Sequence, residues 1–388
     1  MHHSATDPRP RVLHLAQPVD GGVARVVLDL TRAQLAARLR VTVAAPGGEL
    51  ATGARELGAD VRTWRATRSP GPALAGEVRR LVRLIGEVRP DLVHAHSAKA
   101  GLAGRLAARG RVPTVFQPHA WSFEAVGGAT AALALNWERW GARWAARVVC
   151  VSEAERTRGV RAGIDARWSV IPNGVDTERF SPAPAAGARA LLPGGVGPAA
   201  PLVVCVGRLC RQKGQDVLLD AWDAVLHRVP DARLVLVGDG PDRGRLRSRA
   251  PRAVFFAGAV SDAVPWYRAA DLVALPSRWE GMALAPLEAM ACGRPVLVTD
   301  VDGARESLPT ALAAHCLVPP GAPGPLADAV TGLLLDPALR ARLGDRARRH
   351  VLSTHDVRHT AGAVADLYRD LLGGRPAMSS ECREPVHP

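Results

Sequence analysis

The chain has 388 residues, a formal net charge of +13 and a hydrophobic fraction of 47%. This length allows two domains with substantial cores, and the composition is that of a globular protein. The sequence contains neither an apolar run of the roughly 18 residues needed for a membrane span nor an apolar signal core. Six scattered cysteines without a C-x-x-C pair favour reduced thiols. We therefore expect a cytoplasmic protein, with a position at the inner membrane surface left open.

The positive charge points to an anionic partner, which can be nucleic acid, a membrane surface or an anionic substrate. The basic residues are dispersed, aromatic residues make up only 4% and no RNA-binding motif occurs, so we do not expect a nucleic acid partner. Only Lys99 and Lys213 among the 50 basic residues are lysines. Because arginine stands almost everywhere else, we single out these two positions as candidates for a specific role.

The first half of the sequence alternates short apolar runs with amphipathic segments, which predicts a parallel sheet covered by helices. The predicted strands cover residues 11–16, 41–45, 61–64, 91–97, 112–116, 148–151 and 170–171. The predicted helices cover 24–39, a segment ending at 53–58, 76–88 and a segment that begins at Lys99. Gly21 and Gly22 lie in the turn before the first helix, which is too short for a dinucleotide fingerprint and equally fits a tight turn without a ligand.

His94 and His96 are two residues apart in a predicted strand and therefore lie on the same face of the sheet. Such a pair can bind zinc, but no third ligand follows at a spacing typical of metal sites. We therefore expect a hydrogen-bonded histidine pair and no metal site.

Trp137, Trp140 and Trp144 recur at helical spacing beside three arginines. A stripe of this kind can lie on an acidic membrane, but it belongs more often to a buried helix. We predict a buried helix over 136–147, with a peripheral membrane contact as the alternative.

The second half repeats the alternation of strands and helices after a segment rich in Pro, Ala and Gly at 181–200, which reads as a linker. The predicted strands cover residues 202–206, 234–237, 254–256, 272–275 and 295–298. The predicted helices cover 215–226, a segment that starts near 284, 325–335, 337–352 and 355–372, and residues 373–388 read as a tail.

The segment from 271 to 306 contains a strand, a loop and a helix that carry Glu280 and Glu288 at the carboxyl edge of the predicted sheet. Backbone N–H groups of Gly281, Met282 and Ala283 can bind phosphate oxygens at the start of the helix. The two carboxylates can accept hydrogen bonds from the hydroxyls of a ribose or a hexose. The ligand expected here is therefore anionic in one part and polyhydroxylated in another, as a sugar nucleotide is.

This segment also resembles the E-x7-E signature of the retaining glycosyltransferases of the GT-B type, in particular glycosyltransferase family 4, with Glu280 and Glu288 as its two acids. The loop G-R-x5-K-G around Arg208 and Lys213 and the turn N-G-V-D at 173–176 resemble further motifs of that family. The resemblance implies an α/β fold with two Rossmann-like domains that face each other across a cleft. Expected boundaries are 1–180 for the acceptor domain, 201–354 for the donor domain and 355–372 for a helix that crosses back to the N-terminal domain.

The resemblance further implies transfer of a hexosyl group from a nucleoside diphosphate sugar, with a UDP-sugar favoured, to an acceptor hydroxyl with retention at the anomeric carbon. Arg208 and Lys213 would bind the diphosphate and stabilise its charge as it leaves. Glu280 would contact the sugar, Glu288 the ribose, and His119, after the fifth strand, the transferred hexose. The binding set is completed by backbone at Gly21, Gly22, Gly207, Gly238, Gly281, Met282, Ala283 and Leu284.

No cofactor or metal ion is expected, because the two cations can neutralise the leaving diphosphate. Asp300 and Asp302 have the spacing of a magnesium-binding pair, but they lie beyond the strand that frames the predicted sugar site. Met282 and Ala283 stand where many relatives have an aromatic residue and a second glycine, which leaves the choice of sugar open.

Two other classes of function stay open at this stage. A sugar-nucleotide epimerase of the same architecture would form product without an added acceptor, and a basic nucleic-acid-binding module would bind DNA in a salt-dependent way. The acceptor of a transferase is equally open, because a saccharide, a glycolipid or other lipid-linked acceptor, and a small natural product such as an aminoglycoside all fit.

Overall fold

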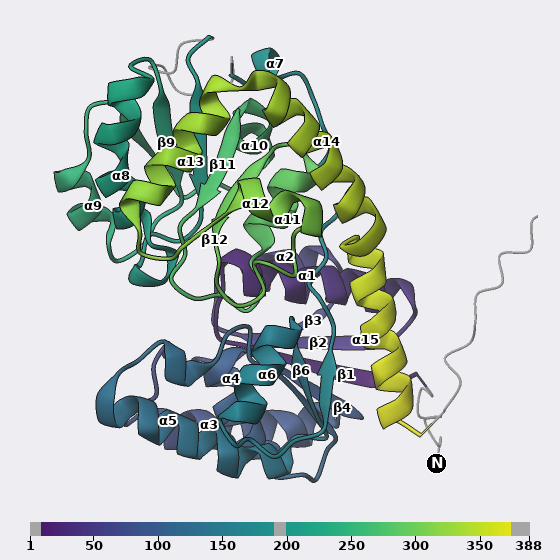
Figure 1. Ribbon diagram of the computed structural model, residues 1–388. Helices are drawn as coiled ribbons and strands as arrows, with labels where there is room; N and C mark the ends of the chain where they lie inside the picture. The colour runs from purple at the N-terminus through teal and green to yellow at the C-terminus, as the bar shows by residue number, and fades with distance from the viewer. Residues whose placement is uncertain (1–8, 190–198, 374–388) are drawn as a thin grey trace, which may run out of the picture.

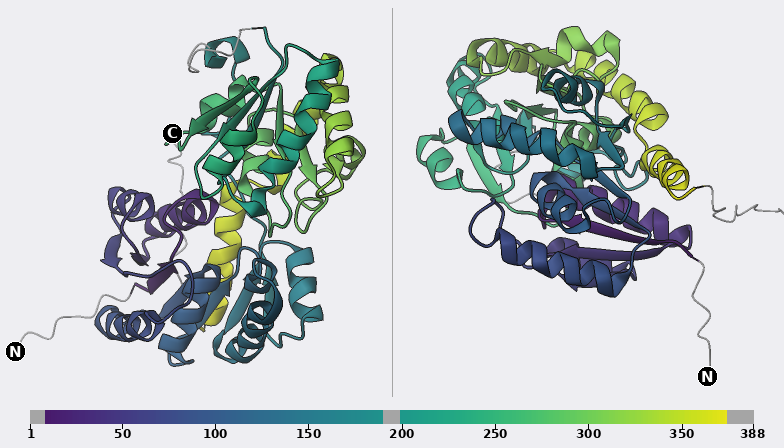
Figure 2. Two further views of the ribbon diagram at one scale, coloured as in Figure 1. Left: turned by 90° about the vertical axis from the view of Figure 1, so that its left-hand side faces the viewer. Right: turned by 90° about the horizontal axis from the view of Figure 1, so that it is seen from below.

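The computed structural model describes residues 9–189 and 199–373. Within them the chain forms two α/β halves, each built on a parallel sheet with helices on both faces, stacked one above the other (Figures 1 and 2). The predicted division into two Rossmann-like halves is thereby confirmed. The expected tail falls almost wholly outside the described residues, as does Cys382.

The N-terminal sheet has seven strands in the order β3-β2-β1-β4-β5-β6-β7, all parallel. The strands are β1 (Arg11–Ala16), β2 (Arg40–Ala45), β3 (Asp60–Thr63), β4 (Leu92–His96), β5 (Thr114–Gln117), β6 (Arg147–Cys150) and β7 (Trp168–Val170). The helices of this half are α1 (Gly21–Ala36), α2 (Glu49–Glu56), α3 (Leu74–Val88), α4 (Ser97–Ala108), α5 (Gly128–Gly141) and α6 (Glu153–Arg161).

The C-terminal sheet has six strands in the order β10-β9-β8-β11-β12-β13, again all parallel. The strands are β8 (Leu202–Val206), β9 (Arg233–Val237), β10 (Val254–Gly258), β11 (Leu272–Leu275), β12 (Val296–Thr299) and β13 (Leu317–Val318). The helices are α8 (Gln215–Arg228), α9 (Arg243–Arg249), α10 (Val264–Ala269), α11 (Leu284–Ala291), α12 (Ala313–Cys316), α13 (Pro323–Leu335), α14 (Pro337–Thr354) and α15 (Val357–Leu371).

The central strands are buried on both faces, which is why they read as continuous apolar runs instead of alternating patterns. All residues of β4 and β11 are buried, and the apolar members of β8 up to Cys205 are at most 2% exposed. The order of the strands reverses between β1 and β4 in one sheet and between β8 and β11 in the other. Ligands of open α/β sheets bind at such reversals, beyond the carboxyl ends of the strands.

The two halves are tied together by the last helices of the chain. α14 runs along the C-terminal half, and α15 continues onto the N-terminal half, where it packs beside α1 (Figure 1). The hydroxyl of the buried Tyr368 on α15 hydrogen-bonds to His94 Nδ1 at 2.6 Å. At the start of α15, the carboxylate of Asp356 accepts a hydrogen bond from Thr177 in the N-terminal half. The predicted crossover helix at 355–372 is therefore present.

Two expectations about surface and linker differ from the structure. The tryptophan helix is not buried, since Trp140 is 43% exposed and α5 buries only Glu138 and Gly141. Part of the expected linker forms the short helix α7 (Ala185–Arg189), which packs on α10, and residues 190–198 lie outside the described residues.

Candidate active site

Loops from the two points of strand reversal meet between the halves. From the C-terminal sheet come the loop after β8, with Arg208 and Lys213, and the loop after β11, with Glu280. From the N-terminal sheet come the start of α1 after β1, where Gly21 and Gly22 form the first helical turn and not the predicted turn before the helix, and the loop after β5, with His119.

The predicted cation and the predicted acid are joined directly. Lys213 Nζ lies 2.5 Å from Glu280 Oε1, and both side chains are mostly buried. The stem of Lys213 passes over Gly207, where a side chain would come within 3.7 Å of it. The second cation, Arg208, is half-buried on the same loop, and its carbonyl accepts a hydrogen bond from Gln215 Nε2 at 3.0 Å. Lys213 and Glu280 thus form an ion pair, and a second cation, Arg208, belongs to the same loop as Lys213.

The second predicted acid, Glu288, lies on α11 and is only partly exposed. Its Oε2 accepts a hydrogen bond from the Tyr267 hydroxyl at 2.7 Å. Burial raises the pKa of Glu288, and the Tyr267 hydrogen bond and the charges of Arg25 and Arg179 act against this rise. Its other oxygen, Oε1, can accept hydrogen bonds from a ligand hydroxyl.

The N-termini of α1 and α11 lie close together. A side chain at Gly22, in the first turn of α1, would lie 3.7 Å from the Leu284 side chain, which begins α11. Within the described residues, neither helix has a side chain that caps its N-terminus. The first N–H groups of both helices are therefore available to an anion, and both helix dipoles favour negative charge here.

The loop between Glu280 and α11 is pressed against the N-terminal half. A side chain at Gly281 would come within 2.9 Å of Val151 and within 3.0 Å of Glu155, so only glycine fits. The Gly281 carbonyl accepts a hydrogen bond from Ser152 Oγ at 3.0 Å, and the Met282 carbonyl accepts one from Asn173 Nδ2 at 2.8 Å. The carbonyls of this predicted binding loop therefore hold the two halves together.

Gly238 brings the loops after β8 and β9 into contact. It has a φ of +134°, and a side chain there would collide with the Gly207 carbonyl at 2.2 Å. The close approach explains why position 238 requires glycine.

His119 and Ala120 both lie in the left-handed region, with φ of +55° and +95°. Two such residues in a row are costly for side chains other than glycine and mark a strained turn. Burial lowers the pKa of His119 to about 3, so that its imidazole is neutral at neutral pH. Its Nε2 lies 3.2 Å from His96 Nδ1.

Glu155 on α6 holds this strained turn, and none of the motifs in the sequence singles it out. Its carboxylate accepts hydrogen bonds from Ala120 N at 2.6 Å and from Val151 N at 2.7 Å. The signal in the sequence was a capping box, because Ser152 caps α6 by accepting from Glu155 N at 3.1 Å. In an ordinary capping box the acid returns to the N-cap residue, whereas here it reaches the neighbouring loop.

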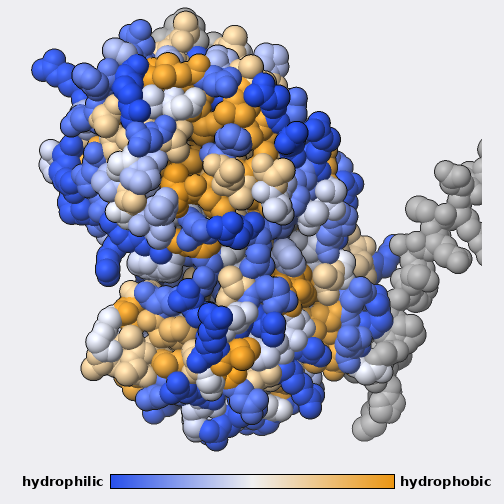
Figure 3. All heavy atoms as spheres, viewed as in Figure 1, coloured by the Kyte–Doolittle hydropathy of each residue, from blue (hydrophilic) through white to orange (hydrophobic). Residues whose placement is uncertain are grey.

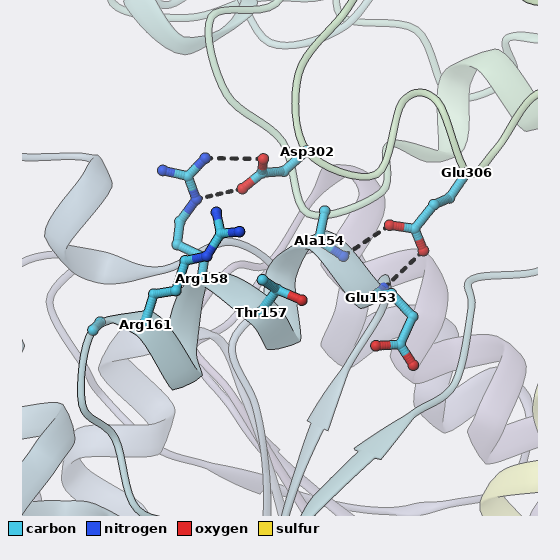
Figure 4. A pocket seen from close by; sticks show the side chains of 8 residues that line it. Glu153, Ala154, Thr157, Arg158, Arg161, Asp302 and Glu306 are labelled. Atoms are coloured by element: carbon cyan, nitrogen blue, oxygen red, sulfur yellow. Dashed lines mark hydrogen bonds and ion pairs between the residues drawn. The ribbon is translucent and has the colours of Figure 1, made fainter.

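A pocket of about 560 Å³, lined mainly by charged residues, lies between α6 and the segment 300–306 of the C-terminal half (Figure 4). At its mouth Glu306 accepts hydrogen bonds from the first N–H groups of α6, Glu153 N at 2.7 Å and Ala154 N at 2.8 Å. Arg158 on α6 donates to Asp302 across the same boundary, with Nη2 2.9 Å from Oδ1. These contacts join α6 of the N-terminal half to the segment 300–306 of the C-terminal half.

Asp300 and Asp302 do not act as a pair. Asp300 binds Arg305, and Asp302 binds Arg158 at the pocket in Figure 4. Each carboxylate already has its own arginine, which is a poor arrangement for a shared magnesium ion.

Comparisons with known proteins cover both halves. Residues 20–179 match the family model described as "Glycosyltransferase Family 4", and residues 200–336 match the one described as "Glycosyl transferases group 1".

Among curated relatives, the D-inositol 3-phosphate glycosyltransferase of Saccharomonospora viridis is 35% identical over 73% of this chain and 70% of its own length. The UDP-Gal:alpha-D-GlcNAc-diphosphoundecaprenol alpha-1,3-galactosyltransferase of Escherichia coli is 32% identical over 58% of this chain, and the match spans only 61% of that protein. The crystal structure of HepE from Anabaena in complex with UDP and glucose is similar with a TM-score of 0.81 and 26% identity, over 93% of this chain and all of that one.

Proposed function

The chain belongs to glycosyltransferase family 4, and from this we propose that it transfers a hexosyl group from a nucleoside diphosphate sugar to an acceptor hydroxyl. The observation that carries the proposal is the Lys213–Glu280 pair, together with the uncapped N-termini of α1 and α11. Cations and N–H groups suit a diphosphate, and carboxylates beside them suit sugar hydroxyls.

In this proposal Arg208 and Lys213 bind the diphosphate and neutralise the charge that develops as it leaves. Glu280 then has two partners, since it holds the Lys213 ammonium in place and accepts a hexose hydroxyl with its second oxygen. Glu288 would bind the ribose, and neutral His119 would contact the hexose as a hydrogen-bonding group. We propose that transfer needs no metal ion, because these cations supply the positive charge.

The donor is proposed to be a UDP-sugar and the reaction to retain the anomeric configuration. The donor choice is supported by the similarity to HepE, whose structure contains UDP and glucose. The proposal of retention is supported by the resemblance of Glu280 and Glu288 to the signature of the retaining enzymes.

For the acceptor we propose a saccharide, an inositol phosphate or a lipid-linked sugar, in line with the names of the two relatives described above. No helix in the described part of the chain is long and apolar enough to span a bilayer. A lipid-linked acceptor would therefore require a surface contact, and we propose the exposed face of α5 for it. Leu133 is 71% exposed and Trp140 is 43% exposed on this face, beside the exposed Arg139 and Arg143.

The central experiment compares the Lys213→Ala variant with wild type in release of UDP, GDP or ADP from the corresponding sugar nucleotides. Loss of one charge-stabilising group should lower kcat by about 100- to 1,000-fold. Arg211→Ala, which removes an exposed cation from the same loop, is the matched control and should keep activity. Activity should also survive a chelator. The proposal is wrong if wild type releases none of the nucleotides, or if Lys213→Ala turns over as wild type does.

A further inference from the structure

Three histidines from two neighbouring strands meet in the interior of the N-terminal half. His14 on β1 and His94 on β4 are register partners, and His96 follows on the same face of β4. All three side chains are fully buried. One ring nitrogen from each lies within 4.8 Å of the others.

The outward-facing nitrogens of these rings are already bound to other groups. His14 Nε2 lies 2.8 Å from Gln34 Oε1, so that this nitrogen carries the proton and donates it. His94 Nδ1 lies 2.6 Å from the Tyr368 hydroxyl, and His96 Nδ1 lies 3.2 Å from His119 Nε2. Partners of this kind fix the orientation of metal-binding imidazoles.

The inward-facing nitrogens are the ones left to bind something else. His14 Nδ1 and His96 Nε2 lie 3.0 Å apart, and His94 Nε2 has no hydrogen-bond partner among the described residues although it is fully buried. Two nitrogens on one tetrahedral zinc ion stand about 3.3 Å apart, given a zinc–nitrogen distance of about 2.05 Å. The spacing of the His14–His96 pair needs only a small adjustment to reach this value, and the His94 nitrogen, which lies within 4.8 Å of the other two, would have to move closer.

We propose that His14, His94 and His96 form a binding site for a divalent transition metal of the zinc class. Three fully buried imidazoles are a ligand set that such ions prefer over Mg²⁺ or Ca²⁺. Gln117 is the register partner of His96 on β5, and its buried Oε1 also lacks a partner among the described residues, so it can close the fourth position. The lowered pKa values of the three histidines keep them neutral and ready to bind a metal.

The site is separate from the diphosphate site, but it reaches the active site through His96. Without a metal, His96 Nε2 donates its proton to His14 Nδ1, and His96 Nδ1 accepts from His119. With a metal on Nε2, the proton of His96 stands on Nδ1 and is donated to His119 Nε2. Metal binding therefore reverses the hydrogen bond at His119 without changing the number of protons on the histidines, and it ties β1 to β4 under the crossover helix.

The test is metal binding by the full chain produced without an added affinity tag. Chelator-treated protein is unfolded and refolded with one equivalent of Zn²⁺ or Co²⁺, because the buried site gives a folded chain little access. After gel filtration, bound metal is counted by elemental analysis, and the Co²⁺ form is checked for the visible absorption of tetrahedral cobalt.

We expect about one equivalent of metal in wild type, a rise in Tm on loading and the tetrahedral Co²⁺ spectrum. His94→Gln should lose all three, whereas His227→Gln, an exposed histidine on α8, should behave as wild type. His2 and His3 are present in every variant, so adventitious binding there cancels in the comparison. No retained metal in refolded wild type, or equal retention in His94→Gln, would overturn the proposal.

Discussion

At the scale of single residues, Glu155 connects a strained turn to the boundary between the halves. It accepts a hydrogen bond from the amide of Ala120, next to His119. One of its oxygens would lie 3.0 Å from a side chain at Gly281, in the loop between β11 and α11. Burial raises the pKa of Glu155 to about 7, and the hydrogen bonds from Val151 and Ala120 act against this rise. The group therefore changes its charge near neutral pH.

We predict that activity falls as the pH falls through about 7, because a protonated Glu155 loses an acceptor for one of the two amides. The pH profile of kcat/KM for Glu155→Gln should lack this step, and its kcat/KM should stay at the value that wild type has below pH 7.

The raised pKa of Glu155 also affects stability, because it means that the folded state binds the proton more tightly than the unfolded chain. The contribution of Glu155 to the free energy of unfolding should therefore increase as the pH falls from about 7 towards its ordinary pKa. Glu87→Gln, an exposed change on α3, should leave both profiles intact; a retained step in Glu155→Gln would contradict the assignment.

The two lysines show what sequence can and cannot indicate about a residue. Both lysines are singled out in the sequence because nearly all other basic residues are arginines. Lys213 lies at the candidate site, where it binds Glu280. Lys99 has a structural role instead, since its Nζ lies 2.6 Å from Glu77 Oε2 with both side chains buried. Composition can indicate that a residue is unusual, but it does not indicate the partner of that residue. The partner of Lys99 on α3 is determined by the packing of helices, which no short motif encodes.

We predict that Lys99→Met lowers the free energy of unfolding by about 3–5 kcal/mol, because it leaves a buried carboxylate without its cation. The double variant Lys99→Met, Glu77→Met should recover most of this loss, since a buried ion pair can be replaced by apolar groups of similar volume. Urea unfolding followed by circular dichroism measures both. Equal losses in the single and double variants would show that the pair is not the cause.

At the scale of elements, the strands were more predictable than the surroundings of the helices. β11 was predicted at 272–275 and is found at Leu272–Leu275, because a strand buried on both faces shows its apolar run directly. α5 was predicted at 136–147 and is found at Gly128–Gly141, with its tryptophans near the surface. A stripe of tryptophans shows that one side of a helix is apolar, but it does not show whether protein or another phase covers it.

The surface over α5 is apolar in the lower left of Figure 3, and we predict that it binds anionic bilayers. Arg143 lies 4.8 Å from the Trp140 ring, so charge and aromatic surface meet at one place. Leu133→Ser combined with Trp140→Ser should reduce cosedimentation with vesicles containing phosphatidylglycerol, and raised salt should weaken the binding of wild type. Leu335→Ser, a change at a site that is 63% exposed on α13 in the other half, is the control. Equal binding by all three proteins would exclude α5 as the contact.

At the scale of the molecule, the sequence predicted two similar halves and a helix that crosses between them. It could not predict how tightly the halves close, because the contacts join residues about 150 positions apart. Glu306 and Asp302 lie at the C-terminal end of the segment 271–306, which contains Glu280 and Glu288, yet they bind α6 of the N-terminal half. Such pairings arise only when both halves have folded, so local patterns carry no signal for them.

We predict that Glu306→Ala favours a form of the molecule in which the two halves lie further apart. Its carboxylate accepts two hydrogen bonds from the first N–H groups of α6, beside the one that the N-cap Ser152 accepts. Such bonds are worth about 1.5–3 kcal/mol each when one partner is charged. Even one such loss shifts the balance between closed and open forms by more than tenfold. Small-angle scattering of the ligand-free protein should then give a larger radius of gyration, and the KM for the sugar nucleotide should rise. Glu56→Ala, an exposed change at the end of α2, should alter neither quantity. If Glu306→Ala keeps the radius and the KM of wild type, the remaining contacts at Gly281, Met282 and Asp302 suffice to hold the halves together.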